Sequence, residues 1–521
     1  MNSKKLYLFL SACHIIHITQ KLEGPHMRIF PILQLLLCIS FAALAQSEET
    51  HPVIYADSVN NFIEIDGLGS SNTHTPFWLQ ANQYGTVPVD VPAGIARISF
   101  ENYWALSPAR NNATSAWRAG FGVEAAGILN EYKKILLPQA YASLKFKNWE
   151  LFVGRKKQYV GLADSTLGTG SYAWSGNALP IPKISIGTNG FVAVPFTKGW
   201  ISFNAFYSDG FFEKGRPVTK NLKFHQKAFY ARIGKANSKL KLFGGFNHQV
   251  QWGGTSKYQE NQGGKLPDGF ANYIYAIFGT IGGTGTDVTH FDSTNRVGNH
   301  LGSLDLAVEL ETYGSSIYLY RQFIYEDGSL FYMEGIQDGL TGLRIRRKNS
   351  FGANFEVTEG VVEVLFTKDQ GGADFNINVG KKRGIDNYFN NQQIRDGWSY
   401  YGRGLGTPFI PPTSQTRWRW PSYADNFTSN NRVLVWHVGL KGTLLRTIQW
   451  HTKLSLSSNS GAYNERFVGS PKQFSGIIGL QTDVNALGGM TIKGSYAADI
   501  GDLYRKTHGF MLGIRKDFTF N

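Results

Sequence analysis

The chain has 521 residues, carries a formal net charge of +14 and contains two cysteines, Cys13 and Cys38. Both cysteines lie in the first 45 residues, so the remainder has no disulfide framework, thiolate metal site or cysteine nucleophile. The positive charge suits an acidic polymer or anionic lipid headgroups. No nucleic-acid recognition motif accompanies the charge, and we expect no nucleic-acid partner.

The N-terminal region predicts export from the cytoplasm. Residues 29–44 are almost wholly apolar, a basic residue precedes them, and residues 43–45 show the small-x-small pattern of a cleavage site. We therefore interpret residues 1–26 as an upstream extension and residues 27–45 as a signal peptide. A lipoprotein box ending at Cys13 is the alternative, but the apolar run before that cysteine is short.

Alternation of apolar and polar side chains predicts β-strands along the rest of the chain. In residues 303–311, for example, four aliphatic side chains share one face and polar or small side chains share the other. The sequence also predicts two hairpins, one around Asn148 and one around residues 235–238. The clearest alternating runs are residues 139–147, 149–153, 228–233, 240–246, 303–311, 433–441, 448–457 and 510–520.

These strands predict a transmembrane antiparallel β-barrel formed by residues 46–521 as a single domain. No run of 18 apolar residues follows the signal, so a transmembrane helix is excluded there. A soluble β-sandwich would show similar alternation. The signal peptide, the strand length of about ten residues and the aromatic C-terminal strand ending at Phe520 favour the barrel. The expected location is the outer membrane.

Four long segments lack sustained alternation and are rich in Gly, Asn, Tyr, Trp and Arg. Loops of this length usually have a function, and in a barrel they either fold into the lumen or form an outer binding surface. Residues 268–278 within one of them predict a short helix. The segments are residues 155–200, 247–300, 325–340 and 384–430.

Catalytic motifs are missing from the sequence. There is no nucleophile elbow, zinc-protease motif or Walker loop, and the glycines at 282–285 lack the strand-to-helix context of a phosphate-binding loop. Glu309 and Glu311 could resemble a glycosidase pair, but we interpret them as lumen-facing charges of a barrel wall. His248 and His300 are interpreted as structural. We expect no enzyme activity, cofactor or metal.

Basic and aromatic residues occur together in the long segments. Aromatic faces stack on sugar rings, and arginine binds carboxylates and phosphates through two parallel hydrogen bonds, so the combination suits an acidic polysaccharide. The alternative is an aromatic girdle with arginines that extend to the membrane interface. The candidate polysaccharide-binding residues are Arg155, Lys156, Lys157, Trp174, Tyr388, Trp398, Tyr401, Arg403, Arg417, Trp418, Arg419 and Trp420.

An ordered series of short motifs resembles the Bacteroidetes branch of the capsule assembly protein Wzi family. The motifs are TPFW at 75–78, NQYG at 82–85, GRKK at 154–157, WSGNALP at 174–180, NHQ at 247–249, WGG at 252–254, GNHLGS at 298–303, DGL at 338–340, DNYFN at 386–390 and GWSY at 397–400. The resemblance implies an outer-membrane barrel of about 18 strands, closed by loops and a periplasmic helical element. It also implies a lectin-like role without catalysis.

The leading hypothesis is therefore an outer-membrane protein that binds and organises exported capsular polysaccharide at the cell surface. Its expected partners are that polysaccharide, outer-membrane lipids and the barrel assembly machinery. A porin or transport channel is the second hypothesis and would require an open lumen. A membrane-embedded hydrolase is the third and would require a catalytic constellation that the sequence does not reveal.

Overall fold

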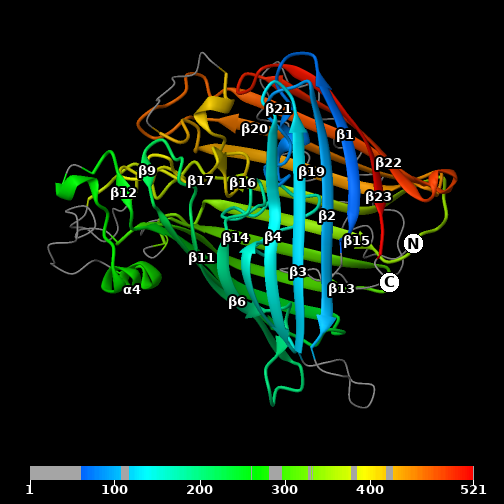
Figure 1. Ribbon diagram of the computed structural model, residues 1–521, viewed down its shortest axis with the longest axis horizontal. Helices are drawn as coiled ribbons and strands as arrows, with labels where there is room; N and C mark the ends of the chain where they lie inside the picture. The colour runs from blue at the N-terminus through cyan, green and yellow to red at the C-terminus, as the bar shows by residue number, and fades with distance from the viewer. Residues whose placement is uncertain are drawn as a thin grey trace, which may run out of the picture. The chain divides into compact units, whose positions relative to one another are not determined.

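The computed structural model describes residues 60–106, 117–259, 261–280, 296–326, 330, 333–376, 384–417 and 426–519. The predicted extension and signal peptide, the glycines at 282–285, residues 418–420 and Phe520 lie outside these residues. Within them, 18 antiparallel strands form a closed barrel, because β1 pairs with β23 as well as with β2 (Figure 1). The predicted fold class is confirmed.

The wall strands follow one another around the barrel in chain order. Their bounds are β1 Phe62–Ser70, β2 Ala93–Ala105, β3 Trp117–Leu129, β4 Lys134–Phe146, β5 Trp149–Arg155, β6 Lys183–Thr188, β8 Ile201–Phe211, β10 Lys223–Ile233, β11 Leu240–Trp252, β13 Asn299–Glu311, β14 Ser315–Tyr325, β15 Gly339–Arg347, β16 Phe355–Phe366, β19 Val433–Leu444, β20 Ile448–Asn459, β21 Lys472–Val484, β22 Met490–Gly501 and β23 Thr507–Asp517. Both predicted hairpins, β4–β5 and β10–β11, are present.

Short elements lie between the wall strands. Strand β7 (Val192–Ala193) pairs with β8, β9 (Thr219–Lys220) pairs with β12 (Thr255–Ser256), and β17 (Ser399–Tyr400) pairs with β18 (Arg403–Gly404). The helices are α3 (Phe77–Gln80), α4 (Phe270–Phe278) and the 3-10 turns Asn261–Gly264, Thr413–Gln415 and Asn485–Leu487. Helix α4 confirms the helix predicted near residues 268–278.

Apolar and polar side chains alternate along the strands, so the outside of the wall is apolar and the inside is polar. On β13, Leu304 and Leu306 are 46% and 57% exposed on the outside, whereas Asp305 on the inside is fully buried. Aliphatic side chains outside and polar side chains inside are the pattern of a barrel whose solvent is lipid. Among the described helices, none is long and apolar enough to cross a membrane.

The two ends of the barrel differ in the length of their connections. At the end where Phe62 pairs with Asp517, which we call the terminal end, turns such as residues 147–148 and 445–447 are short. The longest connections, residues 71–92, 156–182, 253–298 and 367–432, lie at the opposite end, which we call the loop end; β9, β12, β17 and α4 gather there in Figure 1. Because transmembrane barrels place long loops outside the cell, the loop end faces the cell exterior.

Two expectations about the loops need correction. Residues 183–188 form the wall strand β6, although the sequence placed them in a loop; the strand is only six residues long, which is too short for alternation to stand out. Residues 247–252 belong to β11, although the sequence also placed them in a loop. Their alternation was hidden because side chains on both faces are buried there, so apolar and polar residues no longer separate. Both α-helices of the described residues lie in connections at the loop end. The periplasmic helical element that the resemblance implied stays a prediction, because residues 46–59 and 107–116 lie outside the described residues.

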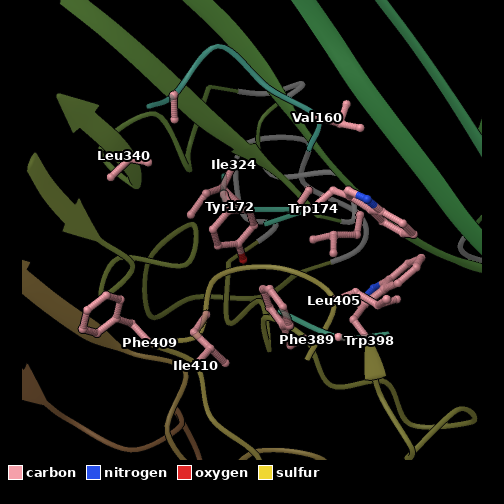
Figure 2. Close-up of a cluster of buried hydrophobic side chains, with 14 of the residues drawn as sticks. Val160, Tyr172, Trp174, Ile324, Leu340, Phe389, Trp398, Leu405, Phe409 and Ile410 are labelled. Carbon is pink, nitrogen blue, oxygen red and sulfur yellow. The ribbon is translucent and has the colours of Figure 1, made fainter. Parts of the chain in front are cut away.

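Three connections at the loop end form a plug inside the barrel: residues 71–92, 156–182 and 384–417. Their apolar side chains, including Trp78, Tyr172 and Phe389, form one buried cluster with inward-facing residues of the wall. Figure 2 shows this cluster, with Tyr172 and Trp174 from one segment near Phe389, Trp398 and Leu405 from another. The inward folding expected for these loops is thus observed in the described residues.

Polar side chains of the wall accept hydrogen bonds from backbone N–H groups of the plug, which is neither helix nor strand in these places. Asp305 accepts from the Leu162 N–H at 2.8 Å, and Glu363 accepts from the Thr169 N–H at 2.5 Å. Gln322 accepts from the Tyr172 N–H at 3.0 Å. Buried backbone groups must be paired, so these wall residues allow a segment without helix or strand to occupy the interior.

Candidate functional site

The candidate site is the hairpin at residues 397–404, which carries β17 and β18 at the loop end. Arg216 holds its first strand, donating to the carbonyl oxygens of Ser399 at 2.7 Å and Gly397 at 3.1 Å. Tyr401 stands at the tip with φ near +48° and is 61% exposed. The hairpin thus presents one aromatic ring to the outside from a fixed base.

A guanidinium lies beside that ring. The Arg155 guanidinium carbon is 5.9 Å from the Tyr401 ring centre and 5.7 Å from that of Tyr400, and Arg155 donates to the Tyr400 hydroxyl at 2.9 Å. The Tyr401 N–H donates to Glu213 at 2.9 Å, which fixes the tip from the other side. An aromatic face next to a cation can hold a sugar ring and its acidic substituent together.

The other strand of the hairpin borders a small crevice. Arg403 donates to Gln80 at 3.1 Å and to the Val87 carbonyl at 2.5 Å, which ties the hairpin to the 71–92 segment. Burial lowers the pKa of Arg403 to about 10, so the side chain stays charged at neutral pH. The crevice, of about 40 Å³, is lined by polar residues that include His74, Gln80, Asn177, Arg403, Gln415 and Arg505.

Arg505 is the exposed cation of this crevice. Among the described residues its guanidinium forms no ion pair, and it lies close enough to His74 to act on it. Burial, together with the Arg505 charge, lowers the pKa of His74 below its usual 6.5. At neutral pH the imidazole is therefore uncharged. The lining contains two arginines and one acidic residue, Asp499, so cations are in excess and an acidic group can neutralise the remaining charge.

The structure brings some of the predicted residues to this surface and places others elsewhere. Arg155, Tyr401 and Arg403 lie on or against the hairpin, and Arg417 lies near the crevice, paired with Asp502 at 2.8 Å. Trp174, Tyr388 and Trp398 are buried in the plug, at 5%, 1% and 0% exposure. Trp418, Arg419 and Trp420 lie outside the described residues.

The two predicted lysines have partners in the wall. Lys156 pairs with Glu150 at 2.7 Å, and Lys157 pairs with Glu124 at 2.6 Å. Their side chains are 10% and 26% exposed. These ion pairs join the start of the plug segment 156–182 to inward-facing carboxylates, so in this structure both lysines hold the plug to the wall.

Sequence reasoning missed Tyr504 and Arg505, which line the crevice from the turn between β22 and β23. The signal was present, because Tyr504-Arg505-Lys506 is a short aromatic and basic run like the one at residues 154–159. The run lies in a short turn, whereas the sequence predicts binding residues in the long loops. For metals, the described residues contain no group of three or more His, Cys, Asp and Glu side chains arranged to hold an ion.

We expect the contribution of Asp338 to the stability of the folded protein to depend on pH. It accepts hydrogen bonds from the Tyr388 hydroxyl at 2.8 Å and from the Gln370 N–H at 2.6 Å, and burial raises its pKa from 3.8 to about 6. Between about pH 4 and 6 the folded protein therefore keeps a proton that the unfolded chain has lost, so stability falls as the pH rises through this window, by up to about 3 kcal/mol.

The measurement is denaturant unfolding in detergent micelles at several pH values for the wild type and Asp338→Asn. We expect the difference in unfolding free energy between the two proteins to decline from pH 4 to pH 6 and to stay constant above it. Parallel pH profiles would show that Asp338 does not contribute in this way.

A family model described as Capsule assembly protein Wzi matches residues 94–415. The solved structure of Wzi from Escherichia coli, described as an outer membrane protein involved in group 1 capsule assembly and a carbohydrate-binding β-barrel, matches with a TM-score of 0.55. It is 17% identical and covers 88% of this chain and 85% of that chain.

Other solved barrels are more distant. OpdL of Pseudomonas aeruginosa matches with a TM-score of 0.42 and 8% identity over 89% of this chain and 99% of that chain, a likeness too weak to inform the site. A comparison with curated proteins gave no match. Neither the family description nor the description of the E. coli structure names a reaction.

The family model spans more than half of the sequence, and the closed barrel matches that of the E. coli protein. The protein is an integral barrel of the outer membrane. From the matched residues and the fold together, this chain belongs to the capsule assembly protein Wzi family.

Proposed function

We propose that this protein binds an acidic capsular polysaccharide at its loop end and holds the polymer at the cell surface without making or breaking bonds. The observation that carries the proposal is the hairpin surface: exposed Tyr401 beside Arg155, with the crevice of Arg403 and Arg505 on the other side. The family's description and the carbohydrate binding described for the E. coli protein support it.

The plug gives this surface its rigidity. Ser175 donates to the Gly406 carbonyl at 2.7 Å, and Asn177 donates to the Gly404 carbonyl at 3.1 Å, so the segment 156–182 supports the hairpin from below. A preformed surface loses little conformational entropy when it binds. Buried Trp174 and Trp398 would then act as support for the binding surface, and the exposed side chains would contact the sugar.

The test is the affinity of the purified protein for the producer's capsular polysaccharide. We expect the double variant Tyr401→Ala/Arg505→Ala to bind at least about tenfold more weakly, because a lost hydrogen bond to a charged group costs about 1.5–3 kcal/mol. Wild-type affinity should also fall with added salt. Polymer whose carboxylates have been reduced to alcohols should bind weakly to both proteins.

A matched control uses the same residue types at the terminal end. Tyr313 is 82% exposed in the turn between β13 and β14, and Arg446 is exposed in the turn between β19 and β20. Tyr313→Ala/Arg446→Ala should bind the polymer like the wild type. If both double variants bind like the wild type, the hairpin surface is not the binding site.

A further inference from the structure

The outside of the barrel wall carries an unexpected polar area near the loop end. On β10, His225 and Lys227 share the outward face with Phe229, which is 43% exposed. Asp209 on β8 and His248 on β11 face outward beside them, by the same alternation. In a barrel surrounded by lipid, polar side chains on this face need a cover.

Helix α4 covers this area from outside. The Tyr273 hydroxyl donates to Asp209 at 2.8 Å, and Lys227 donates to the carbonyl of Ile277 at 2.5 Å, where a cation also interacts favourably with the C-terminal end of the helix dipole. Trp252, which faces outward on β11, packs against Tyr273 with ring centres 5.2 Å apart. Figure 1 shows α4 beside β11 and outside the wall. His225 is consequently fully buried.

The opposite side of α4 is an apolar stripe. Phe270 and Phe278 are 79% and 70% exposed, and Ile274 lies between them at the four-residue spacing of one helix face. The helix contains no charged residue. Since its other side rests on the outside of the wall, the stripe faces away from the barrel. The adjacent row of the wall, where Phe229 and Leu304 both pair with Phe246, is exposed to lipid.

Lysines gather in the neighbouring loop hairpin. Lys220 pairs across β9–β12 with Thr255, and Thr255 also bridges to Lys265. Lys257 follows two residues after Thr255, and all three lysine side chains are exposed. An uncharged helix with one apolar face, next to a cluster of cations, is the pattern of an element that lies in a membrane interface with anionic headgroups.

We propose that α4 is an interfacial helix that lies in the outer leaflet. Its stripe of Phe270, Ile274 and Phe278 contacts the acyl chains, and Lys220, Lys257 and Lys265 bind the phosphate groups of anionic lipids at the same level. The occupant is a lipid surface, because the stripe continues the lipid-facing side of the wall and the cluster beside it has the opposite charge to the headgroups. The proposal is independent of polysaccharide binding.

Site-directed spin labelling tests the position of the helix. The full chain with Cys13→Ser and Cys38→Ser contains no other cysteine, so one label can be placed at Phe278→Cys. Leu306→Cys on the lipid face and Val468→Cys in a loop, 57% and 94% exposed in the wild type, are the references. In vesicles with phosphorylated glycolipid in the outer leaflet, we expect the label at 278 to be accessible to oxygen and protected from a water-soluble nickel complex, like the label at 306.

Two results would overturn this assignment. One is a label at 278 that is as accessible to the nickel complex as the label at 468. The other is protection from both quenchers together with cross-linking between labelled copies, which would identify a second copy of this chain as the occupant.

The amount of phosphorylated glycolipid that stays bound to the purified protein tests the lysine cluster. We expect Lys220→Glu/Lys257→Glu/Lys265→Glu to retain about tenfold less phosphorylated glycolipid after purification than the wild type. The control, Lys198→Glu/Lys239→Glu/Arg446→Glu, reverses three exposed cations at the terminal end and should retain the wild-type amount. Equal retention by both triple variants would contradict the role of the cluster.

Discussion

Replacing Asp305 and Glu363 together by alanine is expected to release the plug, so that the lumen of the barrel conducts ions. Asp305 accepts from the Leu162 N–H and from the Gln322 side chain, both at 2.8 Å. Glu363 accepts from the Thr169 N–H and from the Tyr320 hydroxyl, both at 2.5 Å. Both carboxyl groups are at most 1% exposed, so no water replaces the lost acceptors.

The expected size of the effect follows from these bonds. Leaving a buried donor without its acceptor costs about 1–3 kcal/mol, so removing both anchors weakens the seating of the plug by about 2–6 kcal/mol. The fraction of barrels with a displaced segment 156–182 should rise by a factor between about 30 and about 10⁴. Single-channel recording in planar bilayers measures this directly, with rare openings in the wild type and frequent ones in the variant.

The matched control removes two carboxylates that contact only the wall. Glu309 pairs with Lys241 at 3.3 Å, and Glu359 pairs with Arg346 at 2.9 Å. Glu309→Ala/Glu359→Ala loses the same number of buried charges but no bond to the plug. Similar conductance in the two double variants would show that general weakening of the barrel, and not release of the plug, opens the path. Heat-dependent gel mobility checks that each variant has folded.

Replacing Arg216 by alanine is expected to loosen the binding hairpin and to abolish most polysaccharide binding. The buried guanidinium contacts the carbonyl oxygens of Ser399 and Gly397, the Thr219 hydroxyl at 2.9 Å and the Asp396 carboxylate at 3.3 Å. Removing one partner of a buried ion pair typically costs about 3–5 kcal/mol. The hairpin should then become accessible to trypsin at Arg403, while the barrel stays folded.

Lysine should not rescue this variant, because an ammonium group cannot reach the four acceptors with the fixed geometry of the guanidinium fork. Arg432→Ala is a suitable control, since Arg432 donates to the Lys368 carbonyl at 2.8 Å in another loop-end segment. If Arg216→Ala binds polysaccharide and resists trypsin like Arg432→Ala, Arg216 does not position the hairpin.

Only part of the candidate site could be predicted from the sequence. The aromatic and basic runs drew attention to Arg155, Tyr401 and Arg403, which the structure places on one surface. The same pattern included Lys156 and Trp174, because composition cannot distinguish an exposed aromatic or basic side chain from one that packs inside a plug. Arg505 lay in a short turn, and only the fold brings that turn next to the hairpin, about one hundred residues away in the chain.

Which end of the barrel carries the candidate hairpin surface was also decided by topology. Each strand reverses direction, so the position of Phe62 and Asp517 at one end assigns every later connection to one end or the other. The sequence marked residues 155–200 as a long loop. Only the hydrogen bonds to Asp305, Gln322 and Glu363 show that residues 156–182 of this segment lie inside the barrel.

The sequence by itself determined eight of the 18 wall strands and which of their side chains face the lipid. A two-residue period is a local property, and a barrel in lipid requires it of each strand in the wall. This is why β13 and both hairpins could be predicted from alternation alone. The tertiary structure alone decided the extent of β11, the path of the plug and the cover that α4 forms over His225. Each of these depends on contacts between segments far apart in the chain, and such contacts leave no period in the sequence.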